Sequence, residues 1–186
     1  MAGLLLIRFL FLPHKIHLMK KIAFVFGLMA LVTLTHAQTG LPEGNLKDLQ
    51  GNVVSTSEIS NDGKPIIISF WATWCKPCLR ELHAYMDYYP EWQEEFGVKL
   101  VAISIDDTRN SAKVPPMVTS EGWEYEVYID ENSDLKRTMG IVNIPHTFVL
   151  DGNGNIVWQH AGYSPGDEDY LYEILQKVAA GEPIEE

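Results

Sequence analysis

Two cysteines, Cys75 and Cys78, are the residues of this sequence best suited to chemistry, and the chain contains no other cysteine. Two thiols separated by two residues can close a small disulfide and open it again. The apolar residues before the pair indicate a buried strand, and the residues from Leu79 onward favour a helix. A strand that delivers a Cys-x-x-Cys pair to a helix N-terminus is typical of a reactive thiolate. The spacing therefore predicts redox chemistry.

Two structural roles compete with this interpretation, a stabilising disulfide and half of a zinc site. A disulfide across two intervening residues closes too short a loop to stabilise the fold much in the loop-entropy account. A structural zinc ion needs four ligands, and His83 and His146 would have to complete the set without a recognised ligand spacing. We therefore expect neither a metal nor a bound cofactor.

The pattern of the chain predicts the elements that would position the pair. Residues 66–70 form a nearly continuous apolar run, which predicts a strand buried on both faces. A long helix should follow over residues 76–96, with Gly97 at its end and Pro90 kinking or dividing it. The other expected elements are a hairpin over 46–54 turning at Gly51-Asn52, a helical turn capped by Ser57, a turn at 61–64, strands at 98–105 and 125–129, a helix within 109–121 broken or restarted at Pro115-Pro116, a helix at 134–139, a hairpin of 147–150 with 156–160, and a helix at 167–180.

Strands that alternate with helices and end in a hairpin predict an α/β sandwich with a mixed central sheet. The length suits one domain, which we place at residues 38–186.

Residues 1–37 have the pattern of a secretory signal peptide. A basic region at Lys20-Lys21 precedes an apolar stretch, and small residues favour cleavage between Ala37 and Gln38. Met19 is a better start than Met1, so the true start is expected there. The alternative is an uncleaved membrane anchor, although lysines interrupt the run before it reaches the ~20 residues needed to span a bilayer.

Cleavage would make an acidic chain more acidic. It would remove four of the 14 basic residues and none of the 25 acidic ones, so the net charge would fall from −11 to −15. Such a surface repels nucleic acid and anionic membranes. In an oxidising compartment, structural disulfides would be expected in numbers, so a single closely spaced pair indicates a catalytic one.

The order of elements, with the dithiol directly after the first core strand, resembles the thioredoxin fold. It is most similar to the TlpA/ResA-like family of exported thiol–disulfide oxidoreductases, over nearly all of residues 38–186. The stretches that carry the resemblance are 70–75 (FWATWC), Glu81 three residues after the second cysteine, 101–106 (VAISID) and 142–151 (VNIPHTFVLD), together with the insertion around 109–121. The resemblance implies a three-layer α/β/α sandwich with an N-terminal hairpin and an inserted helical segment.

Three positions depart from the family pattern. Ser69 stands where thioredoxins have a buried aspartate, so that proton relay is absent. His83 replaces a proline that often kinks the helix, which would move the bend to Pro90. His146 follows Pro145 where threonine is more usual, which affects substrate preference.

Cys75 is the expected nucleophile, because unpaired backbone N–H groups at a helix N-terminus favour its thiolate. Cys78, one turn further on, would be shielded and act as the resolving thiol. Pro77 at an early helical position lacks an N–H that has no intrahelical partner there, and its stiffness would hold the two sulfurs in register. Lys76 could add positive charge, but its side chain is expected in solvent.

The resemblance implies roles for Glu81, Ile144 and Pro145, and the two tryptophans close to the pair in sequence have expected roles as well. Glu81 would be a buried acid beside the dithiol instead of an ordinary surface charge. The Ile144–Pro145 bond would be cis and would leave the Ile144 backbone free to pair with a substrate strand. Trp74 would form an exposed apolar platform at the site, and Trp71 either flanks the site or belongs to the core.

The sequence thus predicts an exported thiol–disulfide oxidoreductase of the periplasm or cell envelope. The family resemblance favours a reductase of disulfides in client proteins, kept reduced by a membrane thiol donor, with no nucleic-acid partner and with membrane attachment only if the signal segment is retained. The alternatives are an oxidant or isomerase of the same fold, and a non-enzymatic module that binds peptides at the Pro145 loop. A peroxidase of related fold is less favoured, because the sequence lacks its Pro and Thr frame before a lone cysteine.

Overall fold

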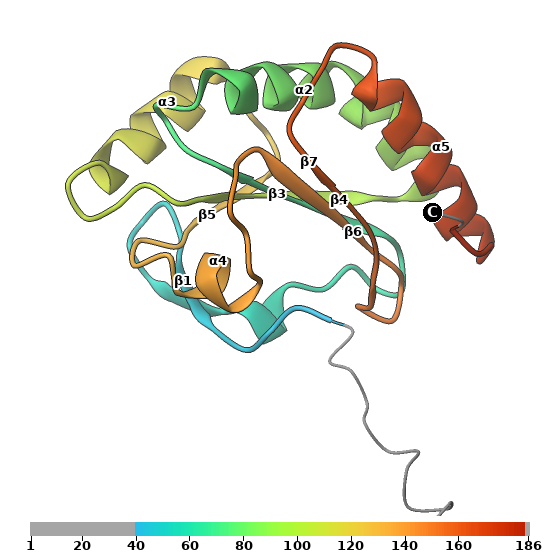
Figure 1. Cartoon of the computed structure of the whole chain (residues 1–186), viewed down its shortest axis with the longest axis horizontal. Coiled ribbons are helices and arrows are strands. Elements are labelled where there is room, and N and C mark those ends of the chain that lie inside the picture. The colour runs from blue at the N-terminus through green and yellow to red at the C-terminus, as the bar shows by residue number, and fades with distance from the viewer. Residues whose placement is uncertain (1–39, 185–186) are drawn as a thin grey trace, which may run out of the picture. The chain divides into compact units, whose positions relative to one another are not determined.

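The computed structural model describes residues 40–184 (Figure 1). The predicted signal peptide at residues 1–37 lies outside this range. Within residues 40–184, no helix combines the length and the apolar character needed to cross a bilayer.

One mixed sheet of seven strands runs through the domain in the order β2-β1-β5-β4-β3-β6-β7. The central strand β3 pairs in parallel with β4 and antiparallel with β6, and β4 pairs in parallel with β5. The pairs β1–β2, β1–β5 and β6–β7 are antiparallel. The sheet is therefore mixed, as the sequence predicts. The strands are β1 (Asn45–Lys47), β2 (Val53–Ser55), β3 (Ile66–Trp71), β4 (Lys99–Ser104), β5 (Glu126–Ile129), β6 (His146–Leu150) and β7 (Ile156–Ala161).

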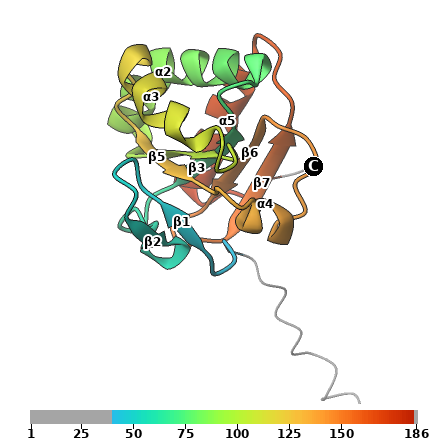
Figure 2. The same ribbon diagram turned by 90° about the vertical axis from the view of Figure 1, so that its left-hand side faces the viewer.

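Helices cover both faces of the sheet. Three of them, α2 (Lys76–Phe96), α3 (Val114–Glu121) and α5 (Asp167–Ala180), lie above it in Figure 1, and the short α4 (Asp134–Thr138) lies below it. A 3-10 turn over Thr56–Glu58 lies with β1 and β2 on the side of α4 (Figure 2). Each face has its own apolar core, so the three-layer sandwich that the resemblance implies is confirmed.

Every side chain of β3 is buried, as expected for a strand covered by helices on both faces. Its odd and even positions contribute to different cores: Ile67 and Trp71 pack beneath α2, whereas Ile66, Ile68 and Phe70 face α4. This burial fixes the strand whose carboxyl end leads into the dithiol.

The local expectations at the prolines and at the first cap have mixed outcomes. Pro90 lies inside a single helix, so of its two expected effects the division is wrong, and buried Tyr85 and Trp92 on either side hold both halves against the sheet. The restart at Pro115-Pro116 is confirmed: a 3-10 turn over Ser111–Lys113 precedes α3, and the two prolines occupy the first turn of α3, where a missing N–H costs no hydrogen bond. The 3-10 turn over Thr56–Glu58 is capped by Ser55 and not by Ser57.

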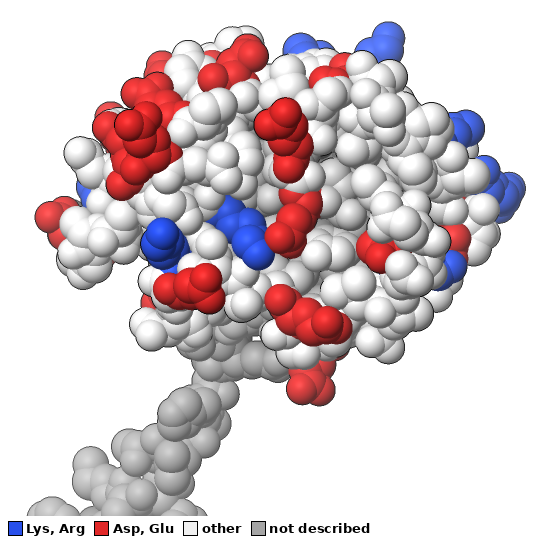
Figure 3. Space-filling model, turned by 180° about the vertical axis from the view of Figure 1, so that it is seen from behind, with Lys and Arg blue, Asp and Glu red and all other residues white. Residues whose placement is uncertain are grey.

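Acidic side chains occupy several separate groups on the rear face of the domain, among fewer basic ones (Figure 3). This distribution agrees with the excess of acidic residues in the composition.

Candidate active site

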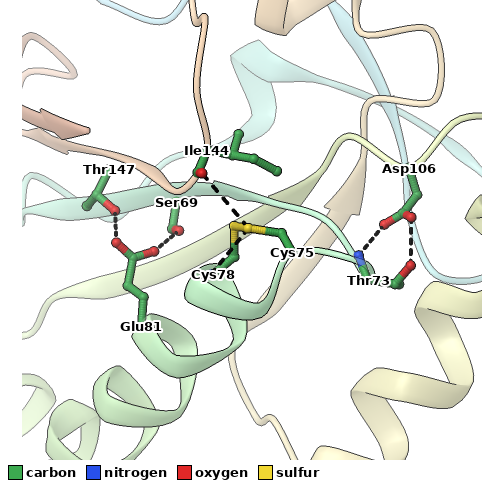
Figure 4. The surroundings of a disulfide bond; sticks show 8 residues. All are labelled: Ser69, Thr73, Cys75, Cys78, Glu81, Asp106, Ile144 and Thr147. Atoms are coloured by element: carbon green, nitrogen blue, oxygen red, sulfur yellow. Dashed lines mark hydrogen bonds between the residues drawn. A yellow bond between two sulfur atoms is a disulfide. The ribbon is translucent and has the colours of Figure 1, made fainter. Parts of the chain in front are cut away.

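A disulfide joins Cys75 to Cys78 at the start of α2, with the two Cα atoms 5.3 Å apart (Figure 4). Cys75 is the N-cap residue of the helix, and its sulfur accepts a hydrogen bond of 3.3 Å from the backbone N–H of Cys78. Cys75 retains 5% of its exposure, whereas Cys78 has none. The sulfur of Cys75 therefore lies where the helix favours a negative charge and at the more accessible end of the pair.

The two residues between the cysteines occupy the first helical turn. Lys76 is exposed, as expected, and Pro77 stands at a position where its missing N–H leaves no helical carbonyl without a partner.

Glu81 is buried beside the disulfide and is 1% exposed. Its carboxylate accepts hydrogen bonds from the hydroxyls of Ser69 at 2.6 Å, Thr147 at 2.9 Å and Tyr85 at 3.2 Å. Ser69 and Thr147 are direct cross-strand partners of β3 and β6, and Tyr85 lies one turn after Glu81 in α2. The carboxylate thus joins two strands to the helix that carries the cysteines (Figure 4).

Burial raises the pKa of Glu81 from 4.5 to about 7, although its three hydrogen bonds favour the charged form and oppose this rise. The negative charge of Asp167 raises it further. Glu81 can therefore gain and lose a proton near neutral pH.

The loop before β6 lies against Cys75. The Ile144–Pro145 peptide bond is cis, which confirms the geometry that the resemblance implies. The carbonyl oxygen of Ile144 lies 3.9 Å from the sulfur of Cys75. No partner among residues 40–184 accepts a hydrogen bond from the backbone N–H of Ile144.

The two tryptophans around the site have different environments. Trp74 is 62% exposed, in agreement with an apolar platform next to Cys75. Trp71 is entirely buried and packs its ring edge-on against Trp123, with 5.0 Å between ring centres. Trp71 therefore belongs to the core, in the same buried cluster as Cys75 and Cys78, and its flanking role stays a prediction.

The residues that depart from the family pattern have specific contacts. Ser69 cannot supply a carboxylate itself, but it donates a hydrogen bond to that of Glu81. His83 pairs with Glu121 at 2.7 Å. His146 is bonded to Gln159 and stacks on Phe148, and burial lowers its pKa. The two histidines thus have partners away from the sulfurs.

Sequence reasoning missed three members of this arrangement. Tyr85 could have been found from its spacing of four residues after Glu81, which places both on one helical face. Thr147 stands two residues after Pro145, but nothing in the sequence indicates that it contacts Glu81 unless the register of β6 against β3 is known. Asp106 figured only as part of a motif, and the structure shows it fully buried beside the connection that leads to Cys75.

A hollow of about 320 Å³ lies between α2 and the start of β5. Its lining includes Tyr89, Gln93 and Tyr125 but neither cysteine and none of the hydrogen-bond partners of Glu81. We therefore assign the chemistry to the surface at Cys75 and not to this hollow.

Comparisons with known proteins agree with this arrangement. Residues 38–159 match the sequence model of the AhpC/TSA family. Thiol-disulfide oxidoreductase ResA of Bacillus anthracis is 31% identical over 135 residues, which cover 72% of this chain and 75% of the relative. Thiol:disulfide interchange protein DsbE of Haemophilus influenzae is 31% identical over 123 residues, which cover 66% of this chain and 64% of the relative.

Solved structures show the same fold. The solution structure of a thioredoxin-like protein from Porphyromonas gingivalis is 48% identical, with a TM-score of 0.69 over 75% of this chain and 92% of the other. The crystal structure of a putative thiol:disulfide interchange protein DsbE from Chlorobium tepidum is 26% identical, with a TM-score of 0.65 over 75% of this chain and 95% of the other.

Proposed function

The chain belongs to the AhpC/TSA family and is a thiol–disulfide oxidoreductase, and on that premise we propose that it is exported and reduces disulfides in client proteins. The observation that carries the proposal is the position of Cys75, whose sulfur lies at the N-terminus of α2 and accepts the N–H of Cys78. A thiolate in this place is stabilised, and Cys75 is the more exposed of the two cysteines, which favours it for nucleophilic attack on a disulfide.

The reaction begins from the reduced pair. The Cys75 thiolate attacks one sulfur of the client disulfide, so that a mixed disulfide forms and the other client sulfur leaves as a thiolate. Cys78 then loses its proton and attacks the sulfur of Cys75, which releases the second client thiolate. The client gains two electrons and the enzyme is left with the Cys75–Cys78 disulfide seen in the structure. A thiol donor must reduce it again, and we propose a membrane protein for this role.

Glu81 is the proposed base for the second step. It lies three residues after Cys78 in α2, and its pKa of about 7 allows it to take a proton near neutral pH. Its burial beside the pair also supports the reductase direction. A negative charge near a thiolate raises the energy of the reduced form, whereas strongly oxidising members of this fold have a stabilised reduced form.

Client recognition is proposed to involve the loop at Ile144 and the exposed ring of Trp74. The Ile144 carbonyl lies against the nucleophilic sulfur, so its backbone can pair with an extended client segment while the segment's disulfide reaches Cys75. Trp74 offers apolar surface beside the same sulfur.

Whether the protein acts as a reductant or an oxidant can be tested by two measurements. One is the reduction of insulin with dithiothreitol as the donor, and the other is the reduction potential of the Cys75–Cys78 pair in a glutathione buffer. A potential near −270 mV, roughly that of thioredoxin, is expected for a reductant. A potential near about −120 mV would instead identify an oxidant. Variants with Ser at position 75 or 78 should reduce no insulin.

Export is tested separately by the intact mass of protein recovered from the cell envelope. The proposed mature chain begins at Gln38. A mass that still includes Lys20 and Lys21 would identify a membrane-tethered protein and contradict cleavage.

A further inference from the structure

The short connection between β3 and α2 is held by a buried carboxylate that the reaction above does not use. This connection, residues 72–74, delivers Cys75 to the helix. The side chain of Asp106 accepts hydrogen bonds from the backbone N–H of Thr73 at 2.8 Å and from its hydroxyl at 2.7 Å (Figure 4). Asp106 is fully buried and follows β4, the neighbour of β3 in the sheet.

The two hydrogen bonds from Thr73 to Asp106 are not part of the pairing between β3 and β4. Asp106 also accepts the hydroxyl of Ser104 at 2.8 Å and donates its own backbone N–H to that oxygen at 3.0 Å, which together complete the turn after β4. The strands β3 and β4 are already paired as far as Trp71 and Ser104. The two bonds to Thr73 therefore act beyond the end of the sheet, on the connection alone.

Fixing Thr73 constrains the sulfur two residues later. Cys75 has extended backbone angles of φ −92° and ψ 94°, and its N–H is bonded to the carbonyl of Ala72 at 3.0 Å. An N-cap side chain reaches the helical N–H groups from such an extended backbone. The bond from the Cys78 N–H to the Cys75 sulfur thus depends on how the connection enters the helix.

We propose that Asp106 is a positioning residue for Cys75, an inference that rests on the proposed thiol–disulfide function. Its two hydrogen bonds to Thr73 hold the connection so that the Cys75 sulfur stays at the N-terminus of α2, where its thiolate is stabilised. In Figure 4, Asp106 and Glu81 lie on opposite sides of the disulfide, so one acid positions the attacking cysteine and the other serves the resolving one.

The test measures the alkylation rate of Cys75 by iodoacetamide across pH, in a Cys78→Ser background where only one thiol titrates. Thr73→Val removes the hydroxyl bonded to Asp106 and keeps the shape of the side chain, and Thr73→Ser keeps the hydroxyl. Thr73→Val should slow alkylation of Cys75 at pH 7 about three- to tenfold and raise the pH at which the alkylation rate is half-maximal. Thr73→Ser should have the same profile as the Cys78→Ser parent protein. In an Asp106→Ala background, Thr73→Val should have no further effect.

A matched control separates positioning from lost stability. Asp130 is also a buried acid after a strand, and it accepts the N–H groups of Asp134, Leu135 and Lys136 at the start of α4. Asp130→Asn should lower the melting temperature and leave the alkylation profile of Cys75 unchanged.

Two results would overturn the inference: equal profiles for Thr73→Val and Thr73→Ser, or a Thr73→Val effect that persists without the Asp106 side chain. If Asp106→Ala does not fold, the comparison of the two Thr73 variants decides by itself. Alkylation involves no client, so failure of the wild type to reduce insulin would count against the proposed function and not against this inference.

Discussion

Thr147 donates a hydrogen bond of 2.9 Å to the carboxylate of Glu81 and thereby joins β6 to the helix that carries the two cysteines. The strand begins directly after Pro145, so the same short segment contacts Cys75 through Ile144 and the buried acid through Thr147. The loop proposed to bind clients and the proposed proton acceptor are therefore parts of one structural unit.

Thr147→Val should raise the pKa of Glu81 further. A hydrogen bond to a carboxylate favours its charged form, so its loss shifts the balance toward the protonated acid. The pH midpoint of the resolving step should move up by about one unit. Stopped-flow resolution of a mixed disulfide across pH measures this. Thr119→Val, which removes an exposed hydroxyl bonded only within α3, should leave the midpoint unchanged.

Glu81→Gln should change the chemistry of the pair and preserve the fold. The amide oxygen can accept from Thr147 and Tyr85 while the amide nitrogen donates to the Ser69 oxygen, so the geometry survives without the charge. The dithiol should then react at lower pH, because the neighbouring negative charge is gone. The resolving step near neutral pH should slow by about 10²-fold, since general-base assistance is lost.

These two effects of Glu81→Gln are measured by alkylation and disulfide-exchange kinetics over the same pH range. The apparent pKa values belong to the coupled groups, so rates are compared as well as midpoints. Profiles identical to the wild type would show that Glu81 has no part in the reaction.

Glu81 should also make the stability of the oxidised protein depend on pH. Its pKa rises from 4.5 to about 7 on folding, so the native state holds this proton more tightly than the unfolded chain does. Between these pH values the native state binds more protons, and the free energy of unfolding falls as pH rises. The total loss is about 3 kcal/mol, present in full above pH 7.

The measurement is urea unfolding of the wild type and Glu81→Gln at pH 4 and at pH 8. The difference in unfolding free energy between the two proteins should change by this amount, because other titrating groups are common to both. A difference that stays constant with pH would contradict the raised pKa.

The main outline of the fold could be predicted because its signals are local. The buried strand at Ile66–Trp71, the helix at Lys76–Phe96 and the cap at Gly97 follow from apolar runs and from a glycine that adopts φ 62°. The division that Pro90 could cause does not occur, because the packing of Tyr85 and Trp92 outweighs a local helix-breaking preference.

The supporting residues of the site could not be predicted in the same way. The cysteines are adjacent in sequence, but Thr147 reaches Glu81 across 66 residues and Asp106 reaches Thr73 across 33. Such contacts depend on strand register, which the sequence alone did not give. Trp71 and Trp74 are only three residues apart in sequence, but Trp71 is the last residue of β3, whose side chains are all buried, whereas Trp74 lies in the connection after the strand and is exposed.

This difference between the tryptophans predicts opposite phenotypes. Trp74→Ala should change the free energy of unfolding by less than about 0.5 kcal/mol, because the ring is exposed, while raising KM for a protein disulfide. Trp71→Phe should destabilise the fold by about 1–3 kcal/mol, because it leaves a gap against Trp123. Urea unfolding and insulin reduction measure the two effects. An unchanged KM in Trp74→Ala would remove Trp74 from client binding.

Cys78→Ser should trap clients on Cys75. The nucleophile can still form the mixed disulfide, but no thiol remains to resolve it, so the complex accumulates. Cys75→Ser should capture nothing, because Cys78 is fully buried and cannot reach a client sulfur. Non-reducing gels and mass spectrometry of the captured species give the linkage, and the wild type serves as the control that releases its client. Capture through Cys78 in the Cys75→Ser variant would reverse the two roles, and it would require the start of α2 to open, because Cys78 has no exposed surface.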